Sequence, residues 1–229
     1  DANYIFIAPT GQLIVTASPE NLTVNTLESY GDVTVSGTVN AVNLSFYSGT
    51  ADLQGAVTTG TYTQSGGDVT VGGAFVSQQT LTPAGYVTGG NAVITGGTFE
   101  AQAGATVDGA FTVGRTAQVT VDGAALTAAN VNVTGGPNGS VAQGYALTAK
   151  QNIVADNVAV SGGSLKAEGT ITAADTVRVS GGLLTAEQTT AAKDVVVSGG
   201  TYTAQGNVTA TDTLRVSGGT MNAEANVAA

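Results

Sequence analysis

The sequence predicts an all-β fold, a single-stranded parallel β-helix (β-solenoid) with about 18–19 residues per coil and a triangular cross-section. Three observations predict it. A strand motif that ends in Ser-Gly-Gly recurs in the last third of the chain, at 158–163, 177–182, 195–200 and 214–219. Valine and threonine, which favour strands, are frequent, and the 33 glycines favour tight corners. No stretch sustains the apolar period of 3.6 residues that indicates an amphipathic helix.

The serines of this motif set the repeat period. Ser161, Ser180, Ser198 and Ser217 are spaced by 19, 18 and 19 residues. Self-similarity at so short a period is typical of a solenoid, in which each repeat is one coil stacked on the next. We expect the coil to be right-handed, because an irregular spacing interrupted by loops fits that class better than a strict hexapeptide rhythm would.

The repeat at 194–211 shows how one coil is built. Apolar and polar residues alternate along it with the strand period of two, and the alternation is interrupted at corners. The expected inward residues form three pairs: Val195 and Val197, Tyr202 and Ala204, and Val208 and Ala210. Three short strands per coil predict a triangular prism, in which equivalent residues stack about 4.8 Å apart.

Glycines mark one corner of each predicted coil. The first glycine of each Ser-Gly-Gly motif is assigned to this corner because glycine tolerates the positive φ of a tight turn. These structural corner residues are Gly162, Gly181, Gly199 and Gly218.

The repeat is expected to extend over residues 32–229, with two loops bulging from its corners. Motif-like text begins at Asp32, Asn91, Gln118 and Asn130. The loops are placed near 78–85 and 135–144, where Gly, Pro and Asn interrupt the strand pattern.

Both ends of the repeat depart from this pattern. Residues 1–31 are richer in large apolar side chains, so we expect an atypical N-terminal segment that serves as a cap or a docking strand. At the other end, 224–229 aligns with 205–210, so the sequence stops partway round a coil. Either the chain is a piece of a longer repeat protein, or its C-terminal coil takes part in homo-assembly.

Composition limits the partners and the chemistry. The net charge of −10 argues against nucleic acid, whose phosphates require a basic surface. There is no run of 18 apolar residues, so no membrane span is expected. The chain has no His and no Cys, and we expect neither a cofactor nor catalysis. A polysaccharide-active enzyme and an ice-binding protein remain as alternatives, although of the outward pairs compared on the second strand only Thr201 and Thr203 form a threonine pair.

Two sets of polar residues recur with the repeat. Asp156, Asp175, Asp194 and Asp212 precede the first strand of successive coils, which is a candidate Ca²⁺ ladder. The simpler interpretation is that each aspartate accepts a backbone N–H in an Asx turn. A second column, which we interpret as a solvated acidic edge, comprises Glu168, Glu187, Gln205 and Glu224, with Gln102 upstream.

The V-x-V-S-G-G and N-V-T-A repeats of residues 32–229 resemble the β-solenoid stalks of bacterial surface adhesins. That group includes autotransporter passengers and proteins of the filamentous-haemagglutinin type. The resemblance implies an elongated bacterial protein that is exported to the cell surface or the extracellular matrix. It further implies adhesion to a host or cell-surface glycan or protein, without a cofactor. The alternative is a subunit of an extracellular filament whose copies stack head to tail.

Overall fold

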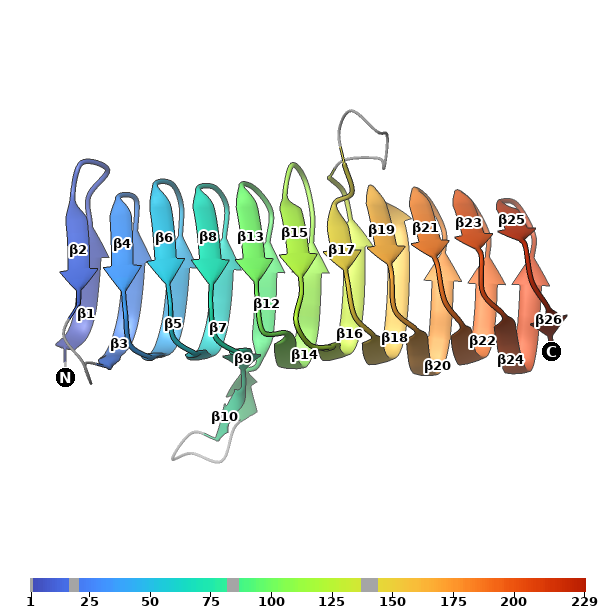
Figure 1. Cartoon of the computed structure of the whole chain (residues 1–229), viewed down its shortest axis with the longest axis horizontal. Coiled ribbons are helices and arrows are strands. Elements are labelled where there is room, and N and C mark those ends of the chain that lie inside the picture. The colour runs from blue at the N-terminus through green and yellow to red at the C-terminus, as the bar shows by residue number, and fades with distance from the viewer. Residues whose placement is uncertain (1, 17–20, 82–86, 137–143) are drawn as a thin grey trace.

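The protein is a rod of stacked coils, with its two termini at opposite ends (Figure 1). The structure is a computed structural model that describes residues 2–16, 21–81, 87–136 and 144–229. Over these residues it contains strands and no helix. Two parallel sheets of 13 and 11 strands run along the rod, and each coil contributes one strand to the smaller sheet. The chain therefore makes about 11 turns of about 19 residues, which confirms the predicted β-solenoid.

The two sheets differ in the length of most of their strands. The larger sheet contains the longer strands: β1 (Ala2–Ile7), β3 (Leu22–Ser29), β5 (Val39–Phe46), β7 (Val57–Gln64), β9 (Phe75–Ser77), β12 (Asn91–Ile94), β14 (Ala105–Val113), β16 (Leu126–Thr134), β18 (Ile153–Gly162), β20 (Ile171–Val179), β22 (Thr190–Val197), β24 (Val208–Val216) and β26 (Val227–Ala228). The smaller sheet contains the shorter strands: β2 (Gln12–Val15), β4 (Asp32–Val35), β6 (Thr50–Leu53), β8 (Asp68–Val71), β13 (Thr98–Ala101), β15 (Gln118–Val121), β17 (Leu147–Ala149), β19 (Ser164–Ala167), β21 (Leu183–Ala186), β23 (Thr201–Ala204) and β25 (Thr220–Ala223).

The cross-section has three sides, although each coil has only two strands. In β18, buried and outward residues alternate up to Ala155, and two successive residues, Asp156 and Asn157, then stay outside the core. Alternation resumes at Val158, so the strand bends there and forms two sides of the prism. β19 forms the third side. Two of the three short strands expected per coil are therefore the halves of one bent strand.

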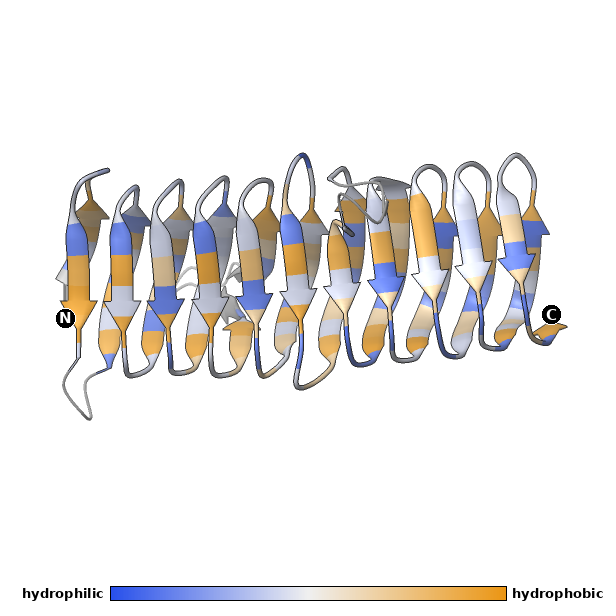
Figure 2. Ribbon diagram, turned by 45° about the horizontal axis from the view of Figure 1, so that its top comes forward, coloured by the Kyte–Doolittle hydropathy of each residue, from blue (hydrophilic) through white to orange (hydrophobic). Residues whose placement is uncertain are grey.

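The core is a set of columns that run along the rod. Val158 pairs with Val177, which pairs with Val195, and all three are fully or almost fully buried. Figure 2 shows the resulting alternation of apolar and polar bands along the strands. Burying a Val or Leu side chain contributes about 1.5–3 kcal/mol, and each coil needs a neighbour to complete this burial. In Figure 1 the smaller sheet lies nearest the viewer, and its strands run downward while the coils advance from left to right, so the coil is right-handed.

At the loop predicted near 78–85, residues 82–86 lie outside the described residues, and the residues on either side form an antiparallel pair of strands that leaves the rod (Figure 1). Its strands are β10 (Gln79–Leu81) and β11 (Val87–Gly89). The hairpin is inserted between β9 and β12, which both pair with β7. β9 and β12 are thus the two halves of one bent strand. Of the loop predicted at 135–144, residues 137–143 lie outside the described residues.

Residues 2–16 and 21–29 belong to the solenoid. β1 pairs with β3 in the larger sheet, and β2 pairs with β4 in the smaller one. The boundary expected at residue 32 therefore does not separate two architectures. The large apolar residues before it form the first coil, where Ile5 and Leu13 pack against the core.

Two of the upstream motif matches fall on the other side of the coil. The sequence that begins at Asp32 is similar to that at Asp194, but Asp32 starts β4 in the smaller sheet whereas Asp194 lies in β22 of the larger one. Gln118 likewise starts β15 in the smaller sheet, while Asn91 and Asn130 lie in the larger sheet, as Asp194 does. Every side of the prism needs two inward apolar residues before a corner, so a four-residue pattern does not identify the side.

The two glycines of the Ser-Gly-Gly corners differ in backbone conformation. In three of the four corners the second glycine has positive φ, with 64° at Gly163, 70° at Gly182 and 68° at Gly200, and the first glycine, for which it was predicted, does not. The predicted corner glycines, Gly162, Gly181, Gly199 and Gly218, instead pass against a carbonyl oxygen of the preceding coil. A Cβ added at Gly162 would lie 2.7 Å from the oxygen of Thr134. A Cβ added at Gly163 would clash with the oxygen of Gly135, so close stacking requires both glycines, and positive φ is a further requirement at the second.

Candidate functional site

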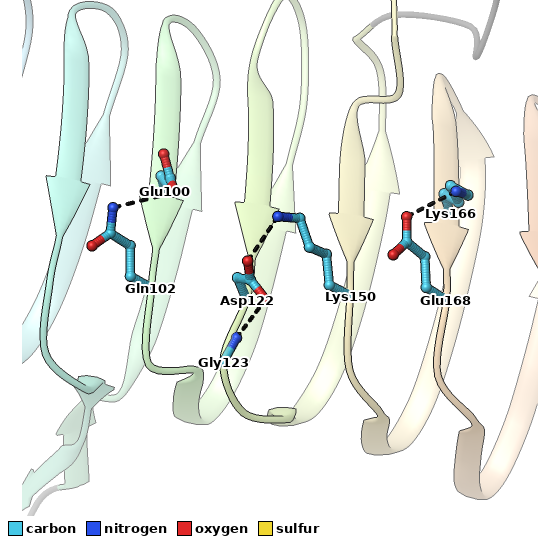
Figure 3. Close-up of polar contacts among 7 residues, drawn as sticks. All are labelled: Glu100, Gln102, Asp122, Gly123, Lys150, Lys166 and Glu168. Atoms are coloured by element: carbon cyan, nitrogen blue, oxygen red, sulfur yellow. Dashed lines mark hydrogen bonds and ion pairs between the residues drawn. The ribbon is translucent and has the colours of Figure 1, made fainter.

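A row of charged side chains follows the end of the smaller sheet from coil to coil. We call Asp122, Lys150, Lys166, Glu168 and Glu187 the charged corner. The backbone places three of these residues in adjacent coils, because Lys150 N donates to Val121 O and Glu168 N donates to Ala149 O. Figure 3 shows side chains of this row pointing toward one another.

Lysines hold the charged corner together. Lys150 Nζ lies 2.7 Å from Asp122 Oδ2. Lys166 Nζ lies 2.8 Å from Glu168 Oε1 and 2.9 Å from Glu187 Oε1, so it joins two coils. These bonds raise the pKa of both lysines and lower that of Asp122, whose hydrogen bond from Lys150 is the largest cause. Each charge has an opposite partner, so the charged corner stabilises the stacking of the coils.

The acidic column predicted at this corner is only partly acidic. Glu168, Glu187, Gln205 and Glu224 do lie in one row, because each backbone N–H donates to the carbonyl oxygen of the residue that precedes the equivalent position in the preceding coil. The lysines that pair with this row were not predicted from the sequence. The Lys-x-Glu spacing of Lys166 and Glu168 was an available signal, since residues two apart on a strand share a face.

The four aspartates of the candidate Ca²⁺ ladder do not share one register. Asp194 pairs with Thr176 and Thr213, the residues that follow Asp175 and Asp212 in the sequence. Asp194 is therefore shifted by one register position relative to the other three aspartates. Lys193 takes the place of the missing carboxylate, and its Nζ lies 4.0 Å from Asp175 Oδ1. Within the described parts of the chain, no three His, Cys, Asp or Glu residues form a group that could hold a metal ion.

A groove of about 400 Å³ crosses the first halves of β14, β16, β18 and β20. Its floor is a row of outward side chains in register, and its lining includes carboxylates at the bend: Thr106, Thr127, Val154 and Thr172, with Asp108 and Asp156. At the strand spacing of a sheet, four coils span about 14 Å. The lining contains no basic residue, so the groove repels polyanions.

The outward face of the smaller sheet is not a regular array of threonines. Thr148 pairs with Lys166, which pairs with Thr185, so a charged side chain interrupts the row. On the neighbouring coil Glu100 pairs with Thr120. Ice binding by a flat threonine face therefore gains no geometric support from this sheet.

Comparison with protein-family models, curated proteins and solved structures finds no match to the chain. Across the part of the chain that the structure describes, no helix has the length and hydrophobicity needed to cross a bilayer.

Proposed function

We propose that the protein is the rod of an exported bacterial surface adhesin, which projects or presents a binding surface away from the cell. The observation that carries this proposal is the unbroken stack of the larger sheet, from β1 to β26. About 11 turns at the strand spacing of a sheet give a rod on the order of 50 Å long. A solenoid of this kind separates its two ends by a fixed distance and needs no cofactor for that role.

The surface supports a role in binding rather than in catalysis. The sequence lacks His and Cys, which are common catalytic acids, bases and nucleophiles. The lysines of the charged corner are engaged with carboxylates that join neighbouring coils. We therefore propose no enzymatic activity.

Location and adhesion are the properties to test. In cells that express the full-length gene, an antibody against the rod should label intact cells, and protease added outside should remove the signal. Cells without the gene should adhere less to a host-cell or matrix surface. Signal confined to the cytoplasm, or unchanged adhesion, would contradict the proposal.

A filament subunit is the second candidate, because coils that stack within one chain can also stack between copies of it. Such a head-to-tail contact propagates. Val216 and Val227, at inward register positions opposite Val197 and Val208, are each 46% exposed. Light scattering after size exclusion should then show growth with concentration, which Val216→Asp should stop. A monomer at all concentrations would exclude this assembly.

A further inference from the structure

Outward-facing aromatic side chains gather on one side of the first three coils. In β1, Tyr4 and Phe6 point away from the core and are 55% and 53% exposed. Tyr30 and Tyr47 follow β3 and β5 at the neighbouring corner. Elsewhere among the residues whose side chains are described, the aromatic rings are buried in the core, apart from the half-buried Tyr145.

The register arranges these rings and their polar neighbours as a small grid. We call this grid the aromatic face. Tyr4 pairs with Thr26 and Thr26 with Asn43, while Phe6 pairs with Glu28 and Glu28 with Ser45. The rings of Tyr30 and Tyr47, at the corner that follows β3 and β5, complete the aromatic face.

Contacts within the aromatic face hold its rings in place. The ring centroids of Tyr30 and Tyr47 lie 4.6 Å apart in a stacked arrangement, and that of Phe6 lies 5.7 Å from Tyr30. The Tyr4 hydroxyl donates a 2.8 Å hydrogen bond to Glu28 Oε2. Rings fixed in this way lose little conformational entropy when a ligand packs on them.

The size of the aromatic face suits a small ligand better than a protein. Three coils span about 10 Å along the axis, and the four-residue stretch from Tyr4 to the corner spans about 13 Å. The footprint is therefore on the order of 130 Å², whereas a stable protein interface buries about 800 Å² per partner. A second copy of the chain would need contacts well beyond the aromatic face.

The chemistry of the aromatic face selects a sugar. A pyranose ring has a face of C–H groups, which packs on the electron-rich face of an aromatic ring, and an edge of hydroxyls. The Glu28 carboxylate and the Asn43 amide offer hydrogen-bond partners to such hydroxyls, and a bond to a carboxylate is the stronger kind. The same carboxylate, on a chain of net charge −10, disfavours acidic sugars and nucleic acid.

We propose that the aromatic face is a binding site for a neutral glycan. This inference rests on the proposed function, since it names the ligand class that the rod would adhere to. Tyr4 and Phe6 form the platform on which the sugar rings pack, and Glu28 and Asn43 bind the hydroxyls.

Isothermal titration calorimetry on the purified 229-residue chain tests the site. The probes are neutral oligosaccharides of glucose, galactose, mannose and N-acetylglucosamine, with polygalacturonate as the acidic comparison. We expect binding of at least one neutral probe, and about tenfold or greater weakening by Phe6→Ala and by Tyr4→Ala. The control is Ile14→Ala, because Ile14 is 54% exposed in the first coil but lies in the other sheet. Circular dichroism verifies that each variant is folded.

Several outcomes would overturn the inference. They are the absence of binding to every neutral probe, stronger binding of polygalacturonate, and equal weakening by Ile14→Ala. A dimer in light scattering that Phe6→Ala dissolves would assign the aromatic face to a second copy instead. Loss of surface labelling in cells, with glycan binding intact in solution, would contradict the proposed adhesin function and leave the site standing.

Discussion

Replacing Lys166 by Met should destabilise the rod by removing the cation that joins two coils. The side chains of Lys166, Glu168 and Glu187 are 24%, 33% and 33% exposed, so each ion pair is treated as a surface pair worth about 0.2–1 kcal/mol. Two such pairs contribute about 1 kcal/mol. The two carboxylates repel each other both with and without Lys166, so this repulsion adds nothing to the difference between the variant and the unmodified protein. The expected loss is therefore about 1 kcal/mol.

Thermal unfolding followed by circular dichroism measures this loss. About 1 kcal/mol corresponds to a decrease in Tm of roughly 2–4 °C for a chain of this size. Lys150→Met is the matched control, since Lys150 has one carboxylate partner and is more exposed, and it should lower Tm less. In 1 M NaCl, where the Debye length is about 3 Å, the difference between Lys166→Met and the unmodified protein should shrink.

The pH dependence has a defined sign. The folded protein raises the pKa of Lys166 above its unfolded value, chiefly through the hydrogen bond to Glu168. Its contribution is therefore complete below the unfolded pKa of about 10.4 and is lost as the pH rises through the folded value. A Tm difference that is absent at low salt, or that persists undiminished in 1 M NaCl, would refute this electrostatic account of the charged corner.

Three further predictions concern the core, a corner and an exposed carboxylate. Phe99→Ala should destabilise the protein by about 3–5 kcal/mol in urea unfolding, because Phe99 is 1% exposed and packs edge-on against two rings at 5.2 and 5.3 Å; a loss below about 1 kcal/mol would contradict this packing. Gly182→Ala should destabilise more than Gly144→Ala in the same assay, since φ is 70° and 71° but only at Gly182 would a Cβ meet neighbouring backbone; equal effects would contradict the close approach of the coils. Hydrogen bonds from the Thr50 backbone N–H and hydroxyl lower the pKa of Asp32, so its stabilisation is present above the unfolded pKa of about 3.9 and is lost as the pH falls through the folded value; an acid-unfolding profile unchanged by Asp32→Asn would contradict it.

The sequence was sufficient to predict the coil where one face repeats without interruption. In Val195–Val197 the inward positions stay two residues apart, and the following glycines mark the corner, so period and strand direction could be derived together. The irregular spacing of 18 and 19 also has a local cause. One residue is added at the bend of the longer strand, as the register shift between Ala155 and Asn157 shows, and the apolar positions on either side remain paired.

The features that the sequence did not reveal depend on stacking between coils. Lys150 contacts Asp122, 28 residues away, because the segment between β16 and β17 lengthens the intervening coil. The aromatic face likewise requires the register of three coils, since Tyr4, Phe6 and Tyr30 share no motif. A repeat pattern indicates what each position of a coil needs, but the alignment of individual coils determines which side chains become neighbours.

The bend of the longer strand makes the fold permissive to insertion. Between the two paired halves of the strand, β18 has one unpaired residue, Asp156, and β20 has two. Between β9 and β12 the hairpin of β10 and β11 occupies the same place. In all three cases both halves of the strand keep their partners, because the bend lies outside the hydrogen-bonded ladder. A peptide whose ends lie close together could therefore be grafted at this bend in any coil, and short peptides in successive coils would be displayed about 4.8 Å apart along the rod.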